Sequence, residues 1–201
     1  FLPVVPVPAE YSVGEGYFYF NADMKFGVEN ESQLRMVSDF ATLLGRQTGF
    51  VPSIMIGSET ADVRLETVAS LPDEAYNLVV TSEKILIESA GDAGFFYALQ
   101  SLRQLLPVGV VEGKKQNRTM EYKIPVMTVN DRPRFGYRGL MIDVSRYFMP
   151  KHNLLNIIDA ASFLKINKIH LHLVDDNGWR LEIKKYPRLT QVGAWRVKRD
   201  E

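Results

Sequence analysis

Residues 138–146 read Arg-Gly-Leu-Met-Ile-Asp-Val-Ser-Arg, and residues 167–180 read Asn-Lys-Ile-His-Leu-His-Leu-Val-Asp-Asp-Asn-Gly-Trp-Arg. Each stretch contains an apolar run of strand length that is followed by polar and ionisable residues. The residues between the two stretches carry apolar side chains at helical spacing. The sequence therefore predicts a strand-helix-strand unit whose two strands are parallel neighbours.

The first strand and the helix of this unit have clear patterns. Tyr137 to Val144 lacks helical spacing and has the near-continuous apolar composition of a strand that is buried on both faces. Pro150 suits the first turn of a helix. The apolar face of that helix consists of Leu154, Ile157, Ile158, Ala161 and Leu164.

The second strand alternates sharply. Ile169, Leu171 and Leu173 share one face, and His170 and His172 share the other. In a barrel of parallel strands the aliphatic face packs outward on helices, so we expect both histidines to face the interior. We interpret His170 as a packing or hydrogen-bonding residue, because only His172 lies near the end of the strand.

Parallel neighbours end at the same edge of a sheet, where α/β proteins place their chemistry. The predicted edge receives six polar residues: Asp143, Ser145, Arg146, His172, Asp175 and Asp176. A planar fork of donors beside charged acceptors suits the adjacent hydroxyl groups of a sugar. The alternative is that the carboxylates are only structural partners of Arg146 and Arg180, and for Asp143 both readings are equally open.

Three aromatic residues lie close to this edge in the sequence. We interpret Trp179 as a core residue, with stacking on a sugar ring as the alternative. Tyr147 and Phe148 are assigned to packing.

Upstream of this unit, strands and helices follow one another mostly in blocks, which predicts an α+β domain with helices on one face of its sheet. The expected strands are residues 17–20, 25–28, 53–57, 63–68, 76–80 and 84–88, the last two forming a hairpin. One expected helix begins at the cap Asn30 and ends at Gly45. The other begins at the cap Asp92 and ends at Pro107.

Composition excludes several classes of protein. The chain has 201 residues, of which 46% are hydrophobic and 24% charged, so it is neither disordered nor collagen-like. The formal net charge is zero, which argues against nucleic-acid or anionic-membrane partners and fits a neutral substrate. The absence of cysteine excludes disulfides, thiolate zinc sites and cysteine nucleophiles, but it does not choose a compartment.

No apolar run approaches the roughly 18–20 residues of a membrane span. The first residues, from Phe1 to Pro6, are too short and too rich in proline to form a signal peptide. The polar segment from Gly109 to Tyr122 is predicted to be an exposed hairpin tip or loop. Its Asn117-Arg118-Thr119 matches a glycosylation sequon, and we interpret Lys114 and Lys115 as solvated charges.

The paired motifs at 138–148 and 167–180 resemble the start of the catalytic barrel of the family 20 glycoside hydrolases, the β-N-acetylhexosaminidases. The region before them resembles the N-terminal non-catalytic domain of that family. The resemblance implies a non-catalytic α+β domain at residues 1–132. It also implies an incomplete TIM (β/α)8 barrel, with its first two strands, at residues 133–201.

The resemblance also implies roles for three residues. Arg146 matches the arginine that binds hydroxyls of the terminal sugar, and His172 and Asp175 match positions that support the catalytic acid. In that family the acetamido group of the substrate is the nucleophile, and a neighbouring Asp and Glu late in the barrel assist it. Asp200-Glu201 follows Lys198-Arg199 rather than a barrel strand, so we expect no catalytic residue in this chain.

By the same resemblance, the substrate is a β-linked N-acetylhexosaminide glycan that carries GlcNAc or GalNAc. We expect no cofactor and no metal. The resemblance places the parent enzyme outside the cytoplasm, in a periplasmic, secreted or lysosome-like location.

The stretch from Pro133 to Glu201 is far shorter than the roughly 250 residues of an eight-stranded barrel. We therefore expect the chain to be an N-terminal fragment of a longer enzyme, with little or no glycosidase activity alone. Two strands leave apolar edge surface exposed, which favours self-association through the barrel half.

Two other classes of function remain open at this point. A metal-dependent hydrolase also places His-x-His on a barrel strand with carboxylates nearby, although the Asn-Gly-Trp-Arg continuation argues against it. A non-catalytic carbohydrate-binding or scaffolding module would bind sugar without turnover.

Overall fold

The computed structural model describes residues 2–57, 59–106 and 122–196. It divides into two compact units, Phe1–Arg134 (unit 1) and Phe135–Glu201 (unit 2), which are described separately. The sequon at 117–119, Lys114, Lys115 and the Asp200-Glu201 pair lie outside the described residues.

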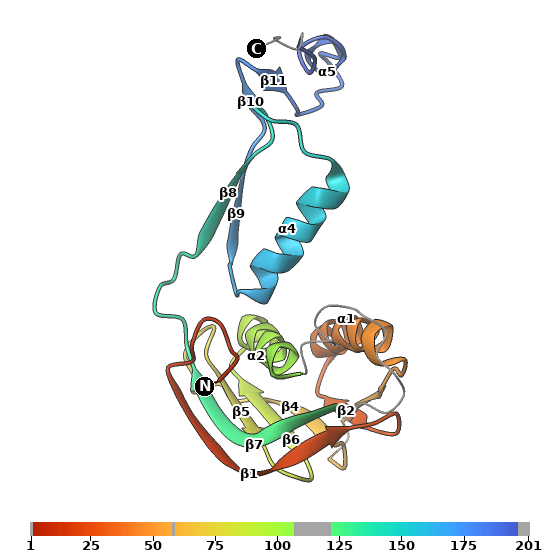
Figure 1. Cartoon of the computed structure of the whole chain (residues 1–201), viewed down its shortest axis with the longest axis vertical. Coiled ribbons are helices and arrows are strands. Elements are labelled where there is room, and N and C mark those ends of the chain that lie inside the picture. Colours follow the sequence, from red (N-terminus) through yellow and green to blue (C-terminus); the bar gives the residue numbers. More distant parts are fainter. Residues whose placement is uncertain (1, 58, 107–121, 197–201) are drawn as a thin grey trace. The chain divides into compact units, whose positions relative to one another are not determined.

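Unit 1 is built on a seven-stranded mixed sheet (Figure 1). Its strands are β1 (Glu10–Phe20), β2 (Lys25–Val28), β3 (Ser53–Ile56), β4 (Val63–Thr67), β5 (Tyr76–Val80), β6 (Ile85–Ser89) and β7 (Tyr122–Asp131), in the spatial order β1-β7-β5-β6-β4-β2-β3. The β3-β2-β4-β6 half is parallel, and β5 pairs antiparallel with β6 and with β7. The predicted hairpin at 76–88 is thus confirmed.

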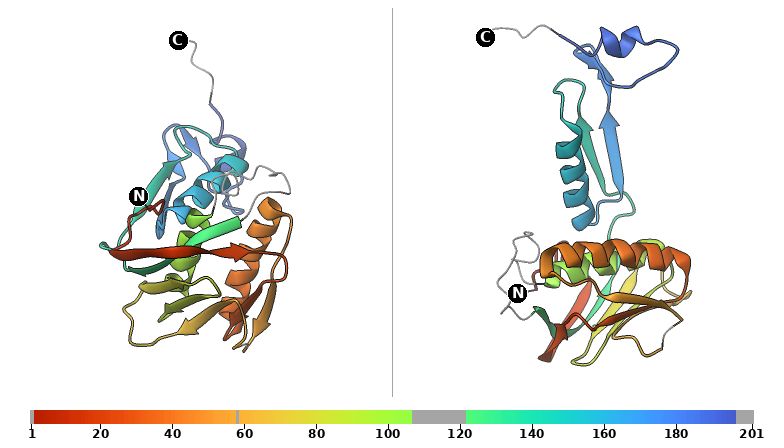
Figure 2. Two further views of the ribbon diagram at one scale, coloured as in Figure 1. Left: turned by 60° about the horizontal axis from the view of Figure 1, so that its bottom comes forward. Right: turned by 90° about the vertical axis from the view of Figure 1, so that its right-hand side faces the viewer.

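Two helices, α1 (Glu31–Thr48) and α2 (Asp92–Leu105), cover one face of this sheet, as predicted (Figure 2). The core lies between the helices and the sheet, where buried apolar side chains alternate with half-buried ones along β5 and β6. Tyr76 is fully buried there, and its hydroxyl lies 2.7 Å from Ser101 Oγ and 2.9 Å from Asp131 Oδ2. Burial raises the pKa of Tyr76 above its ordinary value, so it remains a neutral phenol.

Helix α1 begins where the sequence predicts. The Asn30 side chain accepts hydrogen bonds from the amides of Ser32 and Gln33, both at 3.0 Å. The predicted end at Gly45 is wrong, because the helix continues to Thr48 and ends at Gly49, which has a left-handed φ of 84°. Gly45 serves packing instead: a Cβ there would lie 2.5 Å from the Cγ2 atom of Val51.

The predicted cap of α2 is also wrong. Gly91 occupies the N-cap position and has no side chain to bond the first amides, while Asp92 is the first helical residue. The Asp92 carboxylate instead accepts a hydrogen bond from Ser32 Oγ at 2.6 Å, which ties the starts of the two helices together. The helix ends at Leu105, and Pro107 lies outside the described residues.

Unit 2 contains the predicted strand-helix-strand unit. Strand β8 (Gly139–Asp143) and strand β9 (Lys168–His172) are parallel, and α4 (Lys151–Phe163) connects them and lies alongside (Figure 1). The register runs from Gly139 opposite Lys168 to Asp143 opposite His172. Short strands β10 (Val174–Asp175) and β11 (Gly178–Trp179) pair antiparallel and precede α5 (Arg188–Gln191).

Several burial predictions for unit 2 are wrong. Strand β8 is not buried on both faces, because Leu140 and Met141 are exposed and only Ile142 is buried. His170 is exposed rather than interior, and Tyr147 and Phe148, assigned to packing, are 82% and 65% exposed. Among the described residues β8 pairs only with β9, and two strands beside one helix offer too little surface to bury both faces of a strand.

None of the helices in the described ranges combines the length and the apolar character needed to cross a bilayer.

Candidate active site

The carboxylate of Asp143 organises the end of strand β8. Its Oδ1 atom accepts hydrogen bonds from the backbone amides of Ser145 and Arg146, both at 3.0 Å. Its Oδ2 atom accepts a hydrogen bond from Arg146 Nε. One side chain therefore shapes the turn after β8 and also binds the guanidinium of Arg146.

The parallel register brings His172 beside this carboxylate. His172 Nδ1 lies 3.5 Å from Asp143 Oδ2, and His172 Nε2 lies 3.4 Å from Asp175 Oδ2 and 3.1 Å from the carbonyl oxygen of Val174. Arg146 Nε lies 3.9 Å from Asp175 Oδ2. The structure thus brings together Asp143, Arg146, His172 and Asp175, which we name the rim cluster.

Arg146 is the most exposed member of the rim cluster, with 58% of its side chain accessible to solvent. Among the described residues its guanidinium contacts carboxylates through Nε, and neither terminal nitrogen forms a hydrogen bond. Both terminal nitrogens therefore remain available as donors to a ligand.

The rim cluster holds its carboxylates ionised. The backbone amide of Arg146 is the main cause that lowers the pKa of Asp143, and the Arg146 guanidinium adds to it. The backbone amide of Asp176 is the main cause that lowers the pKa of Asp175, with smaller effects from His172 and Arg146. The hydrogen bond to Asp143 in turn raises the pKa of Arg146. Near neutral pH neither carboxylate is suited to donate a proton as a general acid.

These pKa shifts predict how the stability of unit 2 depends on pH. A carboxylate whose pKa is lower in the folded than in the unfolded state adds stability that is present above about pH 4 and is lost as the pH falls through the folded-state pKa. We expect acidification below pH 4 to destabilise the wild-type chain more than a D143N/D175N variant. Urea unfolding measured through Trp179 and Trp195, the two tryptophans of the chain, reports unit 2. Equal acid sensitivity of the two proteins would contradict this expectation.

Arg180 and Ser145 support the backbone around the rim cluster. The sequence leaves Arg180 open as a partner of the carboxylates. In the described part of the chain it donates instead to carbonyl oxygens: Val144 at 3.0 Å, Ser145 at 3.2 Å, and Ala194. Ser145 is fully buried, and its Oγ donates to the carbonyl of Gly178 at 2.5 Å. Its position inside the structure excludes a direct contact with a ligand at the rim.

One arginine that the sequence did not indicate also holds this region. Arg196 donates to the backbone carbonyl of Arg146 at 3.0 Å and to Asn177 Oδ1 at 2.5 Å. The first contact spans 50 positions, so no local pattern indicates it. Arg180 and Arg196 together fix the backbone from which the Arg146 side chain extends.

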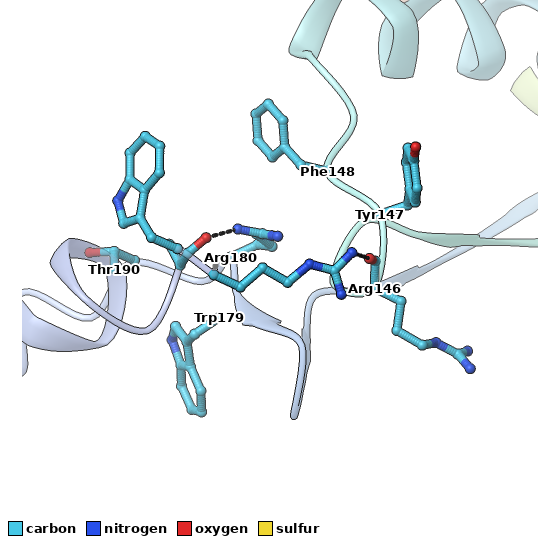
Figure 3. Close-up of a pocket in the computed structure, with 9 residues that line it drawn as sticks. Arg146, Tyr147, Phe148, Trp179, Arg180 and Thr190 are labelled. Atoms are coloured by element: carbon cyan, nitrogen blue, oxygen red, sulfur yellow. Dashed lines mark hydrogen bonds between the residues drawn. The ribbon is translucent and has the colours of Figure 1, made fainter. Parts of the chain in front are cut away.

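A cavity of about 590 Å³ lies next to Arg146 (Figure 3). Tyr147, Phe148, Trp179 and Trp195 line it together with arginine side chains. Trp179 is half-buried, and its indole Nε1 donates to the carbonyl of Leu181 at 2.5 Å, so it is partly a core residue and partly a cavity wall. Figure 3 shows the Arg146 side chain extending away from Trp179 and Arg180.

A metal site finds no support in the described residues, where no group of three or more His, Cys, Asp and Glu side chains is arranged to hold a metal ion. His170 and His172 are successive residues on one face of β9, but only His172 contacts carboxylates.

Comparison with known proteins gives consistent matches along the chain. Residues 2–132 match the model of "Glycosyl hydrolase family 20, domain 2", and residues 135–201 match that of "Glycosyl hydrolase family 20, catalytic domain". The chain belongs to glycosyl hydrolase family 20. The predicted resemblance and the fold class, an α+β domain followed by the first strands of a TIM barrel, are therefore confirmed.

The similarity to individual family 20 proteins extends over nearly all of the chain. It is 32% identical to a beta-hexosaminidase of Porphyromonas gingivalis over 98% of its length, and 33% identical to the N,N'-diacetylchitobiase of Vibrio harveyi over 95%. A mutant beta-hexosaminidase of Streptomyces plicatus in complex with its product GlcNAc superposes with a TM-score of 0.86 at 32% identity over 95% of the chain.

These family 20 proteins are much longer than this chain. The chain spans 26% of the Porphyromonas protein, 20% of the Vibrio chitobiase and 38% of the Streptomyces structure. The matches do not support the two alternative classes, the metal-dependent hydrolase and the non-catalytic carbohydrate-binding module.

Proposed function

We propose that this chain is the N-terminal part of a longer family 20 glycosidase that removes terminal N-acetylhexosamine from the non-reducing ends of β-linked glycans. The observation that carries the proposal is the rim cluster, in which Arg146 is fixed through Nε and presents two terminal nitrogens. The names of the relatives, which are beta-hexosaminidases and a chitobiase, support the same reaction.

In the proposed enzyme, Arg146 binds hydroxyls of the terminal sugar. Its terminal nitrogens are donors in a planar fork, which matches two adjacent hydroxyl oxygens. The positive charge strengthens each of these hydrogen bonds relative to a neutral donor. Arg146 therefore selects and orients the sugar without changing its own protonation.

His172 and Asp175 have a supporting role in this proposal. The acetamido group of the substrate attacks the anomeric carbon, and a separate carboxylic acid protonates the leaving oxygen. Asp143 and Asp175 are both ionised, so the protonating acid is a residue outside the rim cluster. His172 and Asp175, which contact each other, are the polar partners of that acid in this proposal.

Hydrolysis assays with the full-length protein test this function. We expect it to release 4-nitrophenol from 4-nitrophenyl N-acetyl-β-D-glucosaminide and not from 4-nitrophenyl β-D-glucoside, because only the first substrate carries the acetamido nucleophile. The 201-residue chain should release none from either. Equal cleavage of both substrates by the full-length protein, or of neither, would reject the proposed reaction, and turnover by the 201-residue chain would reject its inactivity.

Self-association of the 201-residue chain is a further expectation. Four apolar side chains of the β8–β9 pair are 36% to 51% exposed: Leu140, Met141, Ile169 and Leu171. Burying such a surface against a second copy is favourable. Sedimentation velocity should therefore show a concentration-dependent oligomer that a Met141→Glu/Leu171→Lys double variant weakens. A monomeric wild-type chain at every concentration tested would contradict the expectation.

The family resemblance also supports a location outside the cytoplasm. Fractionation of the source cells tests it, and recovery of the enzyme with cytoplasmic markers would reject it.

A further inference from the structure

We propose that Asp143 is a positioning residue of the active site, which holds Arg146 and His172 in the orientation that the sugar requires. The inference rests on the proposed function and extends it to a residue for which no role is implied by the resemblance.

The two oxygens of Asp143 have different partners. Oδ1 accepts from the amides of Ser145 and Arg146 at 3.0 Å, which fixes the side chain relative to the turn. Oδ2 faces the functional side chains: it binds Arg146 Nε and lies 3.5 Å from His172 Nδ1. The carboxylate therefore connects the rigid end of a strand to both functional groups.

The surroundings of Asp143 and Asp175 differ in a way that favours Asp143 for this role. The Asp143 side chain is 19% exposed, against 36% for Asp175. Asp143 lies within β8 and opposite His172 in the ladder, whereas Asp175 belongs to a two-residue strand. The Arg146 Nε atom is 3.9 Å from Asp175 but hydrogen-bonded to Asp143. Asp143 thus sets the direction of the guanidinium.

Two consequences for the ligand follow from this geometry. Because Asp143 binds Nε, the two terminal nitrogens of Arg146 are left to donate to a ligand. The Arg146 side chain is 58% exposed, so without the contact to Asp143 it would sample many rotamers. Sugar binding would then have to restrict these rotamers, which costs conformational entropy. The ion pair itself adds little to folding stability at such exposure, so its value is in orientation.

The Asp143→Asn variant distinguishes the roles of Oδ1 and Oδ2. The amide oxygen of asparagine can still accept from the amides of Ser145 and Arg146. The amide nitrogen, which replaces Oδ2, is a donor and cannot accept from Arg146 Nε. The turn should persist while Arg146 loses its anchor. Asp159→Asn on the exposed face of α4 is the matched control.

The first test is independent of activity. In ¹⁵N NMR spectra of the 201-residue chain, the Nε–H signal of Arg146 should move and broaden in D143N and stay in place in D159N. Tryptophan fluorescence verifies that unit 2 remains folded. An unchanged Arg146 signal in folded D143N would overturn the inference. Asp143→Glu, which keeps the charge but displaces the carboxylate, replaces D143N if that variant does not fold.

The second test is a double-mutant cycle on the full-length enzyme with the chromogenic N-acetylglucosaminide. We expect D143N to lower kcat/KM by about tenfold or more, and to have little further effect once Arg146 is alanine. D159N should match the wild type. Equal effects of D143N in both backgrounds would overturn the inference, since they show that Asp143 does not act through Arg146. A wild-type enzyme without hydrolytic activity would reject the proposed function, and the NMR comparison would still decide whether Asp143 anchors Arg146.

Discussion

Replacement of Arg146 by alanine in the full-length enzyme is expected to lower kcat/KM for the chromogenic N-acetylglucosaminide by about two orders of magnitude. In the role proposed for Arg146, the substitution removes two charge-assisted hydrogen bonds to sugar hydroxyls, each contributing about 1.5–3 kcal/mol, and water offsets part of this loss. The loss should appear mainly as a higher KM, because hydroxyls that are held equally in the bound substrate and in the transition state contribute uniform binding.

Two controls make this result specific. Arg146→Lys keeps the charge but not the planar fork, so we expect it to recover only a small part of the activity. Arg188→Ala removes an exposed arginine of α5 that has no place in the rim cluster, and it should leave kinetics unchanged. An R146A enzyme with wild-type kinetics would contradict the role of Arg146 in binding the sugar.

Replacement of Gly94 by alanine is expected to have the largest effect on stability. Gly94 lies buried in the first turn of α2, and a Cβ there would approach Ser89 Oγ and the carbonyl oxygen of Ala75 more closely than the 3.0 Å that real Cβ atoms keep. The backbone carbonyl cannot move aside, and the 2.9 Å hydrogen bond from Ser89 Oγ to that carbonyl would break. We expect a loss of about 3 kcal/mol in the free energy of unfolding.

Thermal unfolding followed by circular dichroism measures this loss, and hydrogen exchange of the α2 amides shows where it occurs. The matched control is Gly91→Ala, three residues earlier, where a Cβ meets nothing within 4 Å. The Gly91→Ala substitution should lower the free energy of unfolding by less than about 1 kcal/mol, because the N-cap Gly91 has no side-chain hydrogen bond to lose. Equal stability of the G94A chain and the wild type would show that α2 is able to move away from β6.

The elements that the sequence predicts best are those with a strong internal period. Strand β9 alternates without exception, and the hairpin of β5 and β6 has two alternating runs around a short turn. Their pairing follows from connection length, because a short turn requires antiparallel strands and a helical crossover permits parallel ones. The parallel register of β8 and β9 is the result on which the site depends.

The ends of the helices were harder to predict, for a physical reason. Gly45 and Gly49 are equally good stop signals in the sequence, and only the tertiary contact of Gly45 with Val51 distinguishes them. Asp92 has the composition of a cap, but the extended backbone before the helix belongs to Gly91. Local composition identifies a helix end to within a few residues, and packing selects the residue.

The burial of β8 was predicted wrongly because an apolar composition shows that a strand is suited to be buried. It does not show that other elements are present to cover the strand. Leu140 and Met141 have the side chains of a buried strand, but in the described part of the chain β9 is the only strand beside them. The same reason applies to the exposed Tyr147 and Phe148. The chain corresponds to only 20–38% of the length of the relatives. Those proteins therefore contain many residues that have no counterpart in this chain.

The rim cluster was largely predictable, and its backbone support was not. The positions of Arg146, His172 and Asp175 follow from two strand ends at one edge of a sheet. The clamps formed by Arg180 and Arg196 depend on loops that return from distant positions in the sequence. No sequence pattern marks an arginine that binds backbone carbonyl oxygens. In the sequence, Arg180 and Arg196 therefore cannot be distinguished from arginines on the surface.

A crystal structure of the full-length protein with bound N-acetylglucosamine tests the central claim most directly. It should place the terminal nitrogens of Arg146 within about 3.2 Å of two neighbouring sugar hydroxyls, with Nε still bound to Asp143. It should also place His172 and Asp175 against the acid that protonates the leaving oxygen. A sugar bound away from this end of β8 and β9, with Arg146 free of contact to it, would contradict the account.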